Sequence, residues 1–214
     1  MPVLAKICGI TASDALTAAI DGGAEFVGFV FYPPSPRCVS PSEVLRMTED
    51  FAVAVKKVGL FVDPTNKEIE DILNRVPLEM LQLHGSESPH RVAEIRVEFG
   101  LPVMKALSIA NRANVSEAME FEGSADWIMF DAKAPRGSSR PGGNARSFDW
   151  GLVSGIDISV PWMLAGGLTA ANIIKAVITS DAKAVDVSSG VESIVGKKDP
   201  QKITEFLTAV KALP

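Results

Sequence analysis

Short apolar runs alternate with amphipathic segments along the whole chain. The runs are rich in β-branched and aromatic residues and are bounded by turn residues, which is typical of strands. Several are apolar at successive positions, as parallel strands are when both faces of the sheet are covered. The predicted strands are Val3 to Ile7, Phe26 to Phe31, Val55 to Val62, Glu79 to Leu83, Val103 to Leu107, Trp127 to Phe130, Trp162 to Ala165 and Ala184 to Val187.

Between these runs the apolar residues recur with the period of a helix. Spacing of i, i+3, i+4, i+7 occurs in Ile69, Ile72, Leu73 and Val76, and again in Ile203, Phe206, Leu207 and Val210. Helix starts are predicted by capping boxes at Ser40 to Glu43 and Thr65 to Glu68, and by cap residues before proline at Ser88-Pro89 and Asp199-Pro200. The patterns are short or broken by glycine at Asn111 to Glu122 and Ser147 to Ile156, where the fifth and sixth helices belong.

Repeated strand–helix units favour an α/β fold with a parallel sheet. Eight units in 214 residues suit a small (β/α)8 TIM barrel, and no linker divides the chain, so we expect a single domain over residues 1–214. A doubly wound open sheet is the structural alternative. The glycine fingerprint that opens many dinucleotide-binding folds is absent after the first strand.

The composition argues against two classes of binding partner. The chain is 47% hydrophobic, carries a net charge of −5 and has a pI near 5.1, which argues against nucleic acid or an anionic membrane as partner. We expect neither a membrane span nor a signal peptide, and therefore a cytoplasmic protein. Two cysteines are too few for a disulfide framework, so both are taken as free thiols.

In a barrel, catalytic groups come from the carboxyl ends of the strands, and polar residues of this chain gather there. Cys8 closes the first strand and is followed by glycine; a small buried hydrophobic residue is the simpler interpretation of such a cysteine. The other residues at these ends are Arg37, Asp63, Gln82, His84, Asp131, Gly166, Gly167, Asp186, Ser188, Ser189 and Gly190.

Seven motifs in order resemble one family, phosphoribosylanthranilate isomerase of tryptophan biosynthesis, over nearly the whole chain. They are Lys6-Ile7-Cys8-Gly9, Ser35-Pro36-Arg37, Gln82-Leu83-His84-Gly85, Asp131-Ala132-Lys133, Phe148-Asp149-Trp150, Leu164-Ala165-Gly166-Gly167-Leu168 and Val185 to Glu192. The resemblance implies a TIM barrel that converts N-(5-phosphoribosyl)anthranilate to 1-(2-carboxyphenylamino)-1-deoxyribulose 5-phosphate by an Amadori rearrangement. It implies that Cys8 is the general base and Asp131 the general acid.

The reaction accounts for these residue types. A carboxylic acid can protonate the ribose ring oxygen, and a thiolate can remove the C2 hydrogen of the resulting iminium. The substrate nitrogen is the electron sink, so we expect no metal and no cofactor. Arg37 is expected to bind the anthranilate carboxylate, with a solvated loop charge as the alternative.

Phosphate is expected at the loops after strands seven and eight, at Gly166-Gly167 and Ser188-Ser189-Gly190. Asp186 and His84 join the expected substrate-binding set, although His84 is equally consistent with a structural histidine. Lys6 shares a strand face with Cys8 and either lowers the pKa of the thiol or pairs with Asp186. His90 and Cys38 are assigned no role.

The segment Lys133 to Ser147 contains four basic and no acidic residues, which indicates a basic loop over a doubly anionic substrate; a solvated surface loop is the alternative. It departs from the family at Asn144-Ala145, where a hydroxyl residue and a glycine are usual. The sequence leaves open a monomer or a homodimer.

Two other functions remain open. One is another phosphate-binding barrel, such as an epimerase, which would use metal-binding histidines, or indole-glycerol-phosphate synthase, which would use a lysine acid. The other is a barrel without activity that acts as a binding or scaffold protein. Retention of both Cys8 and Asp131 argues against the second.

Overall fold

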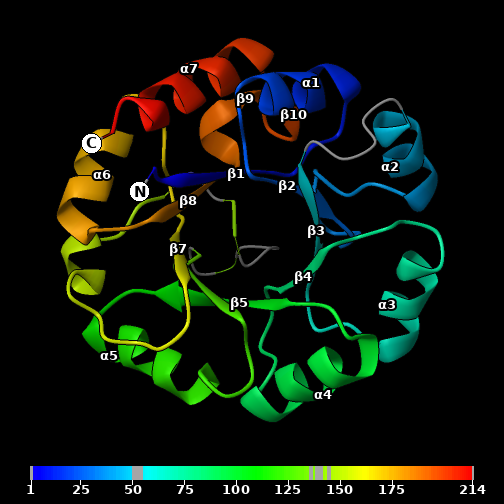
Figure 1. Cartoon of the computed structure of the whole chain (residues 1–214), viewed down its shortest axis with the longest axis horizontal. Coiled ribbons are helices and arrows are strands. Elements are labelled where there is room, and N and C mark those ends of the chain that lie inside the picture. Colours follow the sequence, from blue (N-terminus) through cyan, green and yellow to red (C-terminus); the bar gives the residue numbers. More distant parts are fainter. Residues whose placement is uncertain (1, 50–54, 135–136, 138–141, 144–145, 214) are drawn as a thin grey trace.

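The computed structural model describes residues 2–49, 55–134, 137, 142–143 and 146–213. Eight parallel strands form a closed barrel in chain order, and the last strand pairs with the first. Helices surround the barrel on its outside (Figure 1). The predicted TIM barrel is confirmed, and the closed sheet excludes the open doubly wound alternative.

The strands lie close to the predicted ranges. They are β1 (Leu4–Cys8), β2 (Phe26–Val30), β3 (Lys56–Phe61), β4 (Met80–Leu83), β5 (Val103–Ile109), β6 (Trp127–Ala132), β7 (Trp162–Leu164) and β8 (Ala184–Val187). The helices are α1 (Ser13–Asp21), α2 (Pro41–Thr48), α3 (Asn66–Leu73), α4 (Pro89–Phe99), α5 (Arg112–Ser116), α6 (Ile173–Ser180) and α7 (Pro200–Lys211).

The two stretches with broken helical patterns form only short helices. After β5, the short α5 continues into the 3-10 helix η1 (Glu117–Phe121). Between β6 and β7, the part of the chain that the structure describes has the 3-10 helix η2 (Trp150–Val153) and no α-helix. A further 3-10 turn, η3 (Ser189–Val191), leads into a small hairpin of β9 (Glu192–Ile194) and β10 (Lys197–Lys198), which the sequence pattern did not predict. Strand β6 runs two residues further than predicted and therefore includes Asp131.

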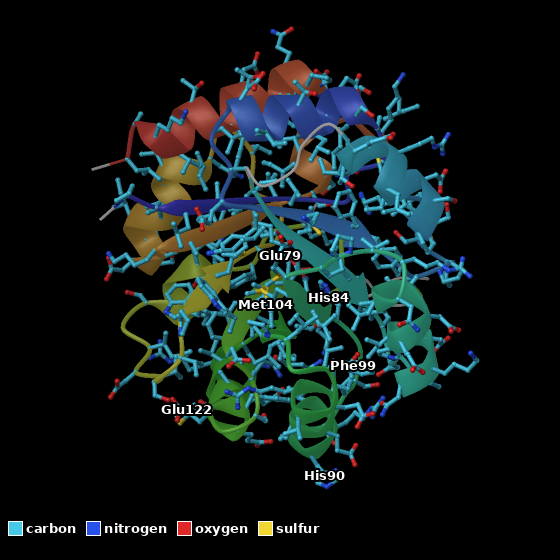
Figure 2. All side chains as sticks on the ribbon, turned by 45° about the vertical axis from the view of Figure 1, so that its right-hand side comes forward. Glu79, His84, His90, Phe99, Met104 and Glu122 are labelled. Atoms are coloured by element: carbon cyan, nitrogen blue, oxygen red, sulfur yellow. The ribbon has the colours of Figure 1, made fainter. Side chains whose placement is uncertain are left out.

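The sheet separates two apolar layers. Alternate strand residues point outward and pack with the helices, among them Ile7, Val27 and Leu81. The intervening residues fill the barrel interior, where Met104 and Met129 lie with Phe26 and other side chains. Met104 lies near the middle of the molecule (Figure 2). Flexible methionine side chains can fill the irregular space of a barrel interior without voids.

The predicted helix starts are confirmed. Ser40 and Glu43 form a capping box at α2, and Thr65 and Glu68 form one at α3. These bonds satisfy backbone N–H groups that have no partner inside the helix, so each helix begins at a defined residue after its strand. None of the described helices combines the length and apolar character that crossing a bilayer requires.

Helix α7 provides a test of the outer layer. Phe206 is completely buried against the outer face of the barrel. We expect Phe206→Ala to lower the free energy of unfolding by about 3–5 kcal/mol, because the cavity cannot fully collapse. Val97→Ala on α4 is the control, since Val97 is 84% exposed and should change stability by less than about 0.5 kcal/mol. Urea unfolding measures both, and equal losses would contradict the packing described here.

Candidate active site

One pocket of roughly 770 Å³, open mouth included, lies at the carboxyl ends of the strands. This size suits a small organic ligand. The residues to which the sequence assigned a catalytic or substrate-binding role all line it: Cys8, Arg37, His84, Asp131, Gly166, Gly167, Asp186, Ser188, Ser189 and Gly190. Gln82, expected at a strand end without an assigned role, and Arg146 of the basic loop line it as well, whereas Asp63, also expected at a strand end, is not among the lining residues.

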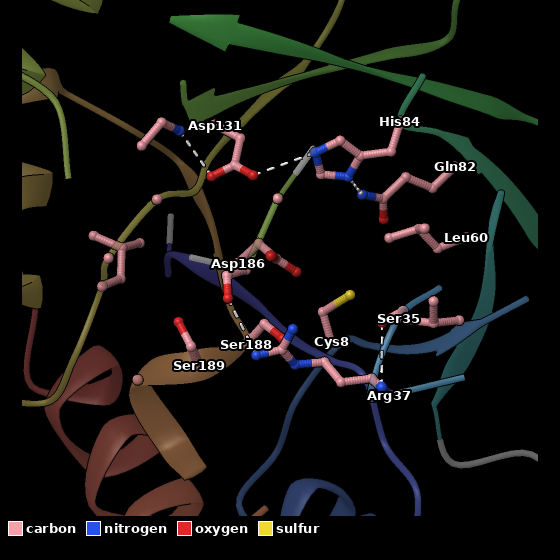
Figure 3. A pocket seen from close by; sticks show the side chains of 18 of the residues that line it. Cys8, Ser35, Arg37, Leu60, Gln82, His84, Asp131, Asp186, Ser188 and Ser189 are labelled. Carbon is pink, nitrogen blue, oxygen red and sulfur yellow. Dashed lines mark hydrogen bonds and ion pairs between the residues drawn. The ribbon is translucent and has the colours of Figure 1, made fainter. Parts of the chain in front are cut away.

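Cys8 is the last residue of β1 and points into the pocket (Figure 3). A Cβ at Gly28, the residue paired with it on β2, would lie 2.8 Å from its Sγ, so a glycine there makes room for the thiol. Burial raises the pKa of the Cys8 thiol above its usual value, and the ammonium of Lys6 offsets only part of this effect. The resting site therefore holds Cys8 mainly as the thiol.

Lys6 lies two residues earlier on the same inward face. Its Nζ is 2.7 Å from Oδ1 of Asp186 on β8, so the predicted pairing is present. Burial works against the charged form, but Asp186 and Cys8 outweigh it and raise the pKa of Lys6 above its ordinary value. A cation is thus fixed beneath the thiol, and both roles considered for Lys6 are compatible with this geometry.

Arg37 belongs to a buried cluster of charges. Its Nε and Nη2 donate to the two carboxylate oxygens of Glu192 at 2.6 and 3.0 Å, and Nη2 also donates to the carbonyl of Gly143 at 3.2 Å. Lys198 donates to the same carboxylate at 2.8 Å and to the backbone of Ser188 at 3.0 Å. Arg37 is only 3% exposed, so the alternative of a solvated loop charge is wrong.

Glu192 and Lys198 were missed by the sequence reading. Glu192 was noted only as the end of a motif, and the hairpin that carries both residues has no clear pattern. Burial raises the pKa of Glu192, but the hydrogen bonds and charges of Arg37 and Lys198 outweigh it and hold the pKa below its usual value. The carboxylate is therefore charged in the folded protein at neutral pH.

Asp131 and His84 face each other at the far side of the pocket from Cys8 (Figure 3). Nε2 of His84 is 3.2 Å from Oδ2 of Asp131, and Oδ1 of Asp131 accepts a hydrogen bond of 2.8 Å from the backbone N–H of Ala132. Nδ1 of His84 is 3.2 Å from Nε2 of Gln82. His84 thus lies among site residues, whereas His90, 84% exposed, lies elsewhere on the surface.

The glycines of the loops permit close approach of backbone to backbone. A Cβ at Gly190 would lie 1.9 Å from the carbonyl oxygen of Leu168, and one at Gly167 would lie 2.7 Å from the backbone of Arg146. Gly166 and Gly167 also have positive φ values of 87° and 65°, which favour glycine. These contacts hold the loops after β6, β7 and β8 together at one side of the pocket.

The basic loop is described only in part. Gly142 lies against Asp131 and His84, because an added Cβ would come within 2.7 and 2.8 Å of them. Arg146 lines the pocket. Arg136, Arg140 and the departure at Asn144-Ala145 lie outside the described residues, so the covering role of this loop stays a prediction.

The fold and this pocket define a (β/α)8-barrel protein with a thiol and a carboxyl group in one pocket at the carboxyl ends of its strands. The family model of N-(5'-phosphoribosyl)anthranilate (PRA) isomerase matches residues 5–209. The chain therefore belongs to the N-(5'-phosphoribosyl)anthranilate isomerase family, as its motifs predicted.

Comparisons with individual relatives support this family membership. The chain is 53% identical over 211 residues to the N-(5'-phosphoribosyl)anthranilate isomerase of Paramagnetospirillum magneticum, covering 99% of this chain and 98% of the relative. It is similar to the crystal structure of the Thermotoga maritima enzyme, with a TM-score of 0.88, 35% identity and coverage of 99% and 100%. It is also similar to a phosphoribosyl anthranilate isomerase in complex with reduced 1-(o-carboxyphenylamino)-1-deoxyribulose 5-phosphate, with a TM-score of 0.82, 32% identity and the same coverage.

The charge cluster around Glu192 predicts a pH-dependent contribution to stability. At about pH 7 we expect Glu192→Gln to lower the free energy of unfolding by about 3 kcal/mol, because two buried cations lose their counter-charge. Since the pKa of Glu192 is lowered in the folded state, this contribution is complete above its usual value of 4.5 and is lost as the pH falls below it. The difference between variant and wild type should therefore shrink as the pH falls below 4.5.

Urea unfolding at several pH values measures this difference. Glu205→Gln on α7 is a matched control, because Glu205 is exposed and its carboxylate meets only the Gln201 amide. A difference for Glu192→Gln that stays constant with pH would show that the charge of Glu192 contributes nothing.

Proposed function

We propose that this protein catalyses the Amadori rearrangement of N-(5'-phosphoribosyl)anthranilate in tryptophan biosynthesis, with Cys8 as general base and Asp131 as general acid. The observation that carries the proposal is that a thiol on β1 and a carboxyl group on β6 face one pocket from opposite sides of the barrel. Membership of the isomerase family supplies the substrate. The product is 1-(2-carboxyphenylamino)-1-deoxyribulose 5-phosphate.

The walls of the pocket differ in a way that suits the two ends of this substrate. On the side of β2 and β3, Val30 and Leu60 form an apolar wall with Tyr32. Such a wall suits an aromatic ring, and Arg37 after β2 is available for its carboxylate. On the side of β7 and β8 lie the glycine-rich loops, whose backbone N–H groups suit a phosphate. The reacting carbons would then lie between Cys8 and Asp131.

The first step is ring opening. Asp131 gives its proton to the ring oxygen, the bond between this oxygen and C1 breaks, and the lone pair of the anilino nitrogen forms a C1–nitrogen double bond. The carboxylate that remains faces the N–H of Ala132 and the imidazole of His84. The substrate itself therefore acts as electron sink, and Asp131 supplies only a proton.

The second step is proton removal at C2. The iminium makes this hydrogen acidic. Cys8 first loses its thiol proton to solvent and then, as the thiolate, takes the C2 hydrogen as a proton. The electrons of the C2–H bond form a C1–C2 double bond, and the π electrons of the C1–nitrogen bond return to nitrogen and neutralise it. The enolamine then tautomerises to the C2 ketone. Lys6 stabilises the thiolate electrostatically, which partly offsets the burial that favours the thiol.

Arg37 is pre-positioned for its proposed ligand. Glu192 takes one edge of the guanidinium in a bidentate pair, so the side chain is fixed before substrate arrives. Fixing it in advance lowers the conformational entropy that binding would cost. Arg37 thus contributes both charge and orientation to recognition of the anthranilate carboxylate.

The alternatives have less support. Among the described residues no cluster of three or more His, Cys, Asp or Glu side chains is arranged to hold a metal ion, as an epimerase of this type would require. A scaffold without activity would not need a thiol and a carboxyl group held at one pocket. A cytoplasmic location and a monomeric or homodimeric state stay predictions.

The acid and base assignment predicts large losses of turnover. Cys8→Ser replaces the thiol with a hydroxyl that is far harder to deprotonate, and Asp131→Asn removes the acidic proton but keeps the shape. Each should lower kcat by about 10² to 10⁴, with a smaller effect on KM. The assay is the loss of anthranilate fluorescence from freshly formed phosphoribosylanthranilate.

Cys38→Ser is the matched control, because Cys38 is an exposed free thiol outside the pocket lining. It should leave kcat nearly unchanged. If Cys8→Ser keeps more than about a tenth of wild-type turnover, a loss of only about 1.4 kcal/mol in barrier, Cys8 is not the base.

Phosphate binding is best tested at a serine. Gly190→Val would push a side chain into the Leu168 carbonyl and disturb the loops themselves. Ser189→Ala removes only a hydroxyl at the pocket wall, and it should weaken inhibition by inorganic phosphate about tenfold, since a hydrogen bond to a charged group is lost. Ser193→Ala, an exposed serine on β9, should not change it. Unchanged inhibition in Ser189→Ala would argue against phosphate at this hydroxyl.

A further inference from the structure

We infer that Gln82 is a positioning residue, which fixes the hydrogen of His84 on Nε2 and thereby orients an N–H group towards Asp131. The inference rests on the proposed role of Asp131 as general acid. Gln82 lies on β4, points into the barrel and is 1% exposed. Figure 3 shows its amide directed at the imidazole of His84.

The amide nitrogen of Gln82 has two neighbours. Its Nε2 lies 3.2 Å from Nδ1 of His84 and 3.3 Å from Sδ of Met129 on β6. An amide nitrogen carries two hydrogens, and a bare imidazole nitrogen and a thioether sulfur are both acceptors. Met129 is paired with Ala106 on the intervening strand β5, and both side chains belong to the interior cluster.

The opposite orientation of the amide is less favourable. It would place the carbonyl oxygen against both the sulfur and Nδ1 of His84. The two N–H groups would then lie at the present position of Oε1, which is buried without a hydrogen-bond partner among the described residues. A buried N–H without an acceptor is rarer than an under-satisfied carbonyl oxygen. The amide nitrogen therefore faces His84, so that Nδ1 must be without a hydrogen and the neutral ring carries its hydrogen on Nε2.

This tautomer matters for Asp131. Nε2 of His84 is 3.2 Å from Oδ2, a contact with the length but not the alignment of a hydrogen bond, and Oδ1 already accepts from Ala132. Once Asp131 has given its proton away, Oδ1 keeps the N–H of Ala132, and a rotation of the His84 ring would align its Nε2–H group with Oδ2. In the other tautomer a nitrogen lone pair would face the carboxylate and repel it, as the wrong histidine tautomer does in other acid–base sites.

The tautomer can be observed without measuring activity. The chain has only two histidines, and His90 is exposed, so ¹⁵N NMR of the imidazoles gives two separable sets of signals, assigned with His90→Asn. At a pH where His84 is neutral, we expect hydrogen on Nε2 and none on Nδ1. In Gln82→Glu a carboxylate replaces the amide, and Nδ1 should gain a hydrogen. Hydrogen on Nδ1 in the wild type would overturn the inference.

Kinetic measurements test whether Gln82 affects catalysis through His84. Gln82→Glu and Gln82→Met should lower kcat about tenfold or more with KM within about twofold, and should change the pH profile of kcat. Met80→Leu is the control, because Met80 lies two residues earlier on the same inward face and should change neither. The titratable or charged side chains that line the same pocket are Cys8, Tyr32, Arg37, His84, Asp131, Arg146 and Asp186.

The outcomes are distinguishable. A wild-type protein without isomerase activity would refute the proposed function and leave the tautomer result intact. Unchanged kcat and pH profile in Gln82→Glu, when its NMR shows that the hydrogen has moved, would refute the positioning role. If a variant fails to fold, the wild-type tautomer alone decides.

Discussion

The pairing of β1 with β8 closes the barrel, and an ion pair crosses this seam. Lys6 lies directly opposite Asp186 in the register that joins the two strands, and their side chains meet inside the barrel at 2.7 Å. A buried ion pair seldom adds net stability, because desolvation offsets the attraction. Its consequence here is positional: a cation lies beneath Cys8 and a carboxylate beside the loop that follows β8. Without closure, neither group would face the pocket.

The interior of the barrel changes character along its axis. The part of the interior away from the pocket is filled by apolar side chains such as Met104 and Met129. The part next to the pocket is filled by charged and polar groups. The apolar part excludes water, so the charges above it act in a medium of low polarity, where they are strong but also costly if unpaired. The buried cations at and beneath the pocket accordingly have carboxylate partners: Asp186 for Lys6, and Glu192 for Arg37 and Lys198.

Much of this arrangement was predictable because it depends on local patterns. The eight apolar runs and the capping boxes specify strands and helix starts, and the rule that strand ends converge places Cys8 and Asp131 in one pocket. The last two residues of β6 were missed because the charged Asp131 interrupts the apolar run, although Asp131 and Ala132 both still pair with β5. Gln82 was placed at the end of its strand without a role, and its inward alternation with Met80 would have assigned it to the pocket.

Other features depend on contacts between distant residues, which no local pattern encodes. Arg37 and Glu192 are 155 positions apart, and their pairing follows only from the hairpin β9–β10 that folds over the loop after β2. Gly190 similarly looks like a phosphate-binding glycine in the sequence, whereas its neighbour in space is the Leu168 carbonyl. Packing between loops alone therefore requires a glycine there. The stable barrel fixes where the strand ends lie, while the loop contacts determine which way each side chain points, and the proposed chemistry requires both.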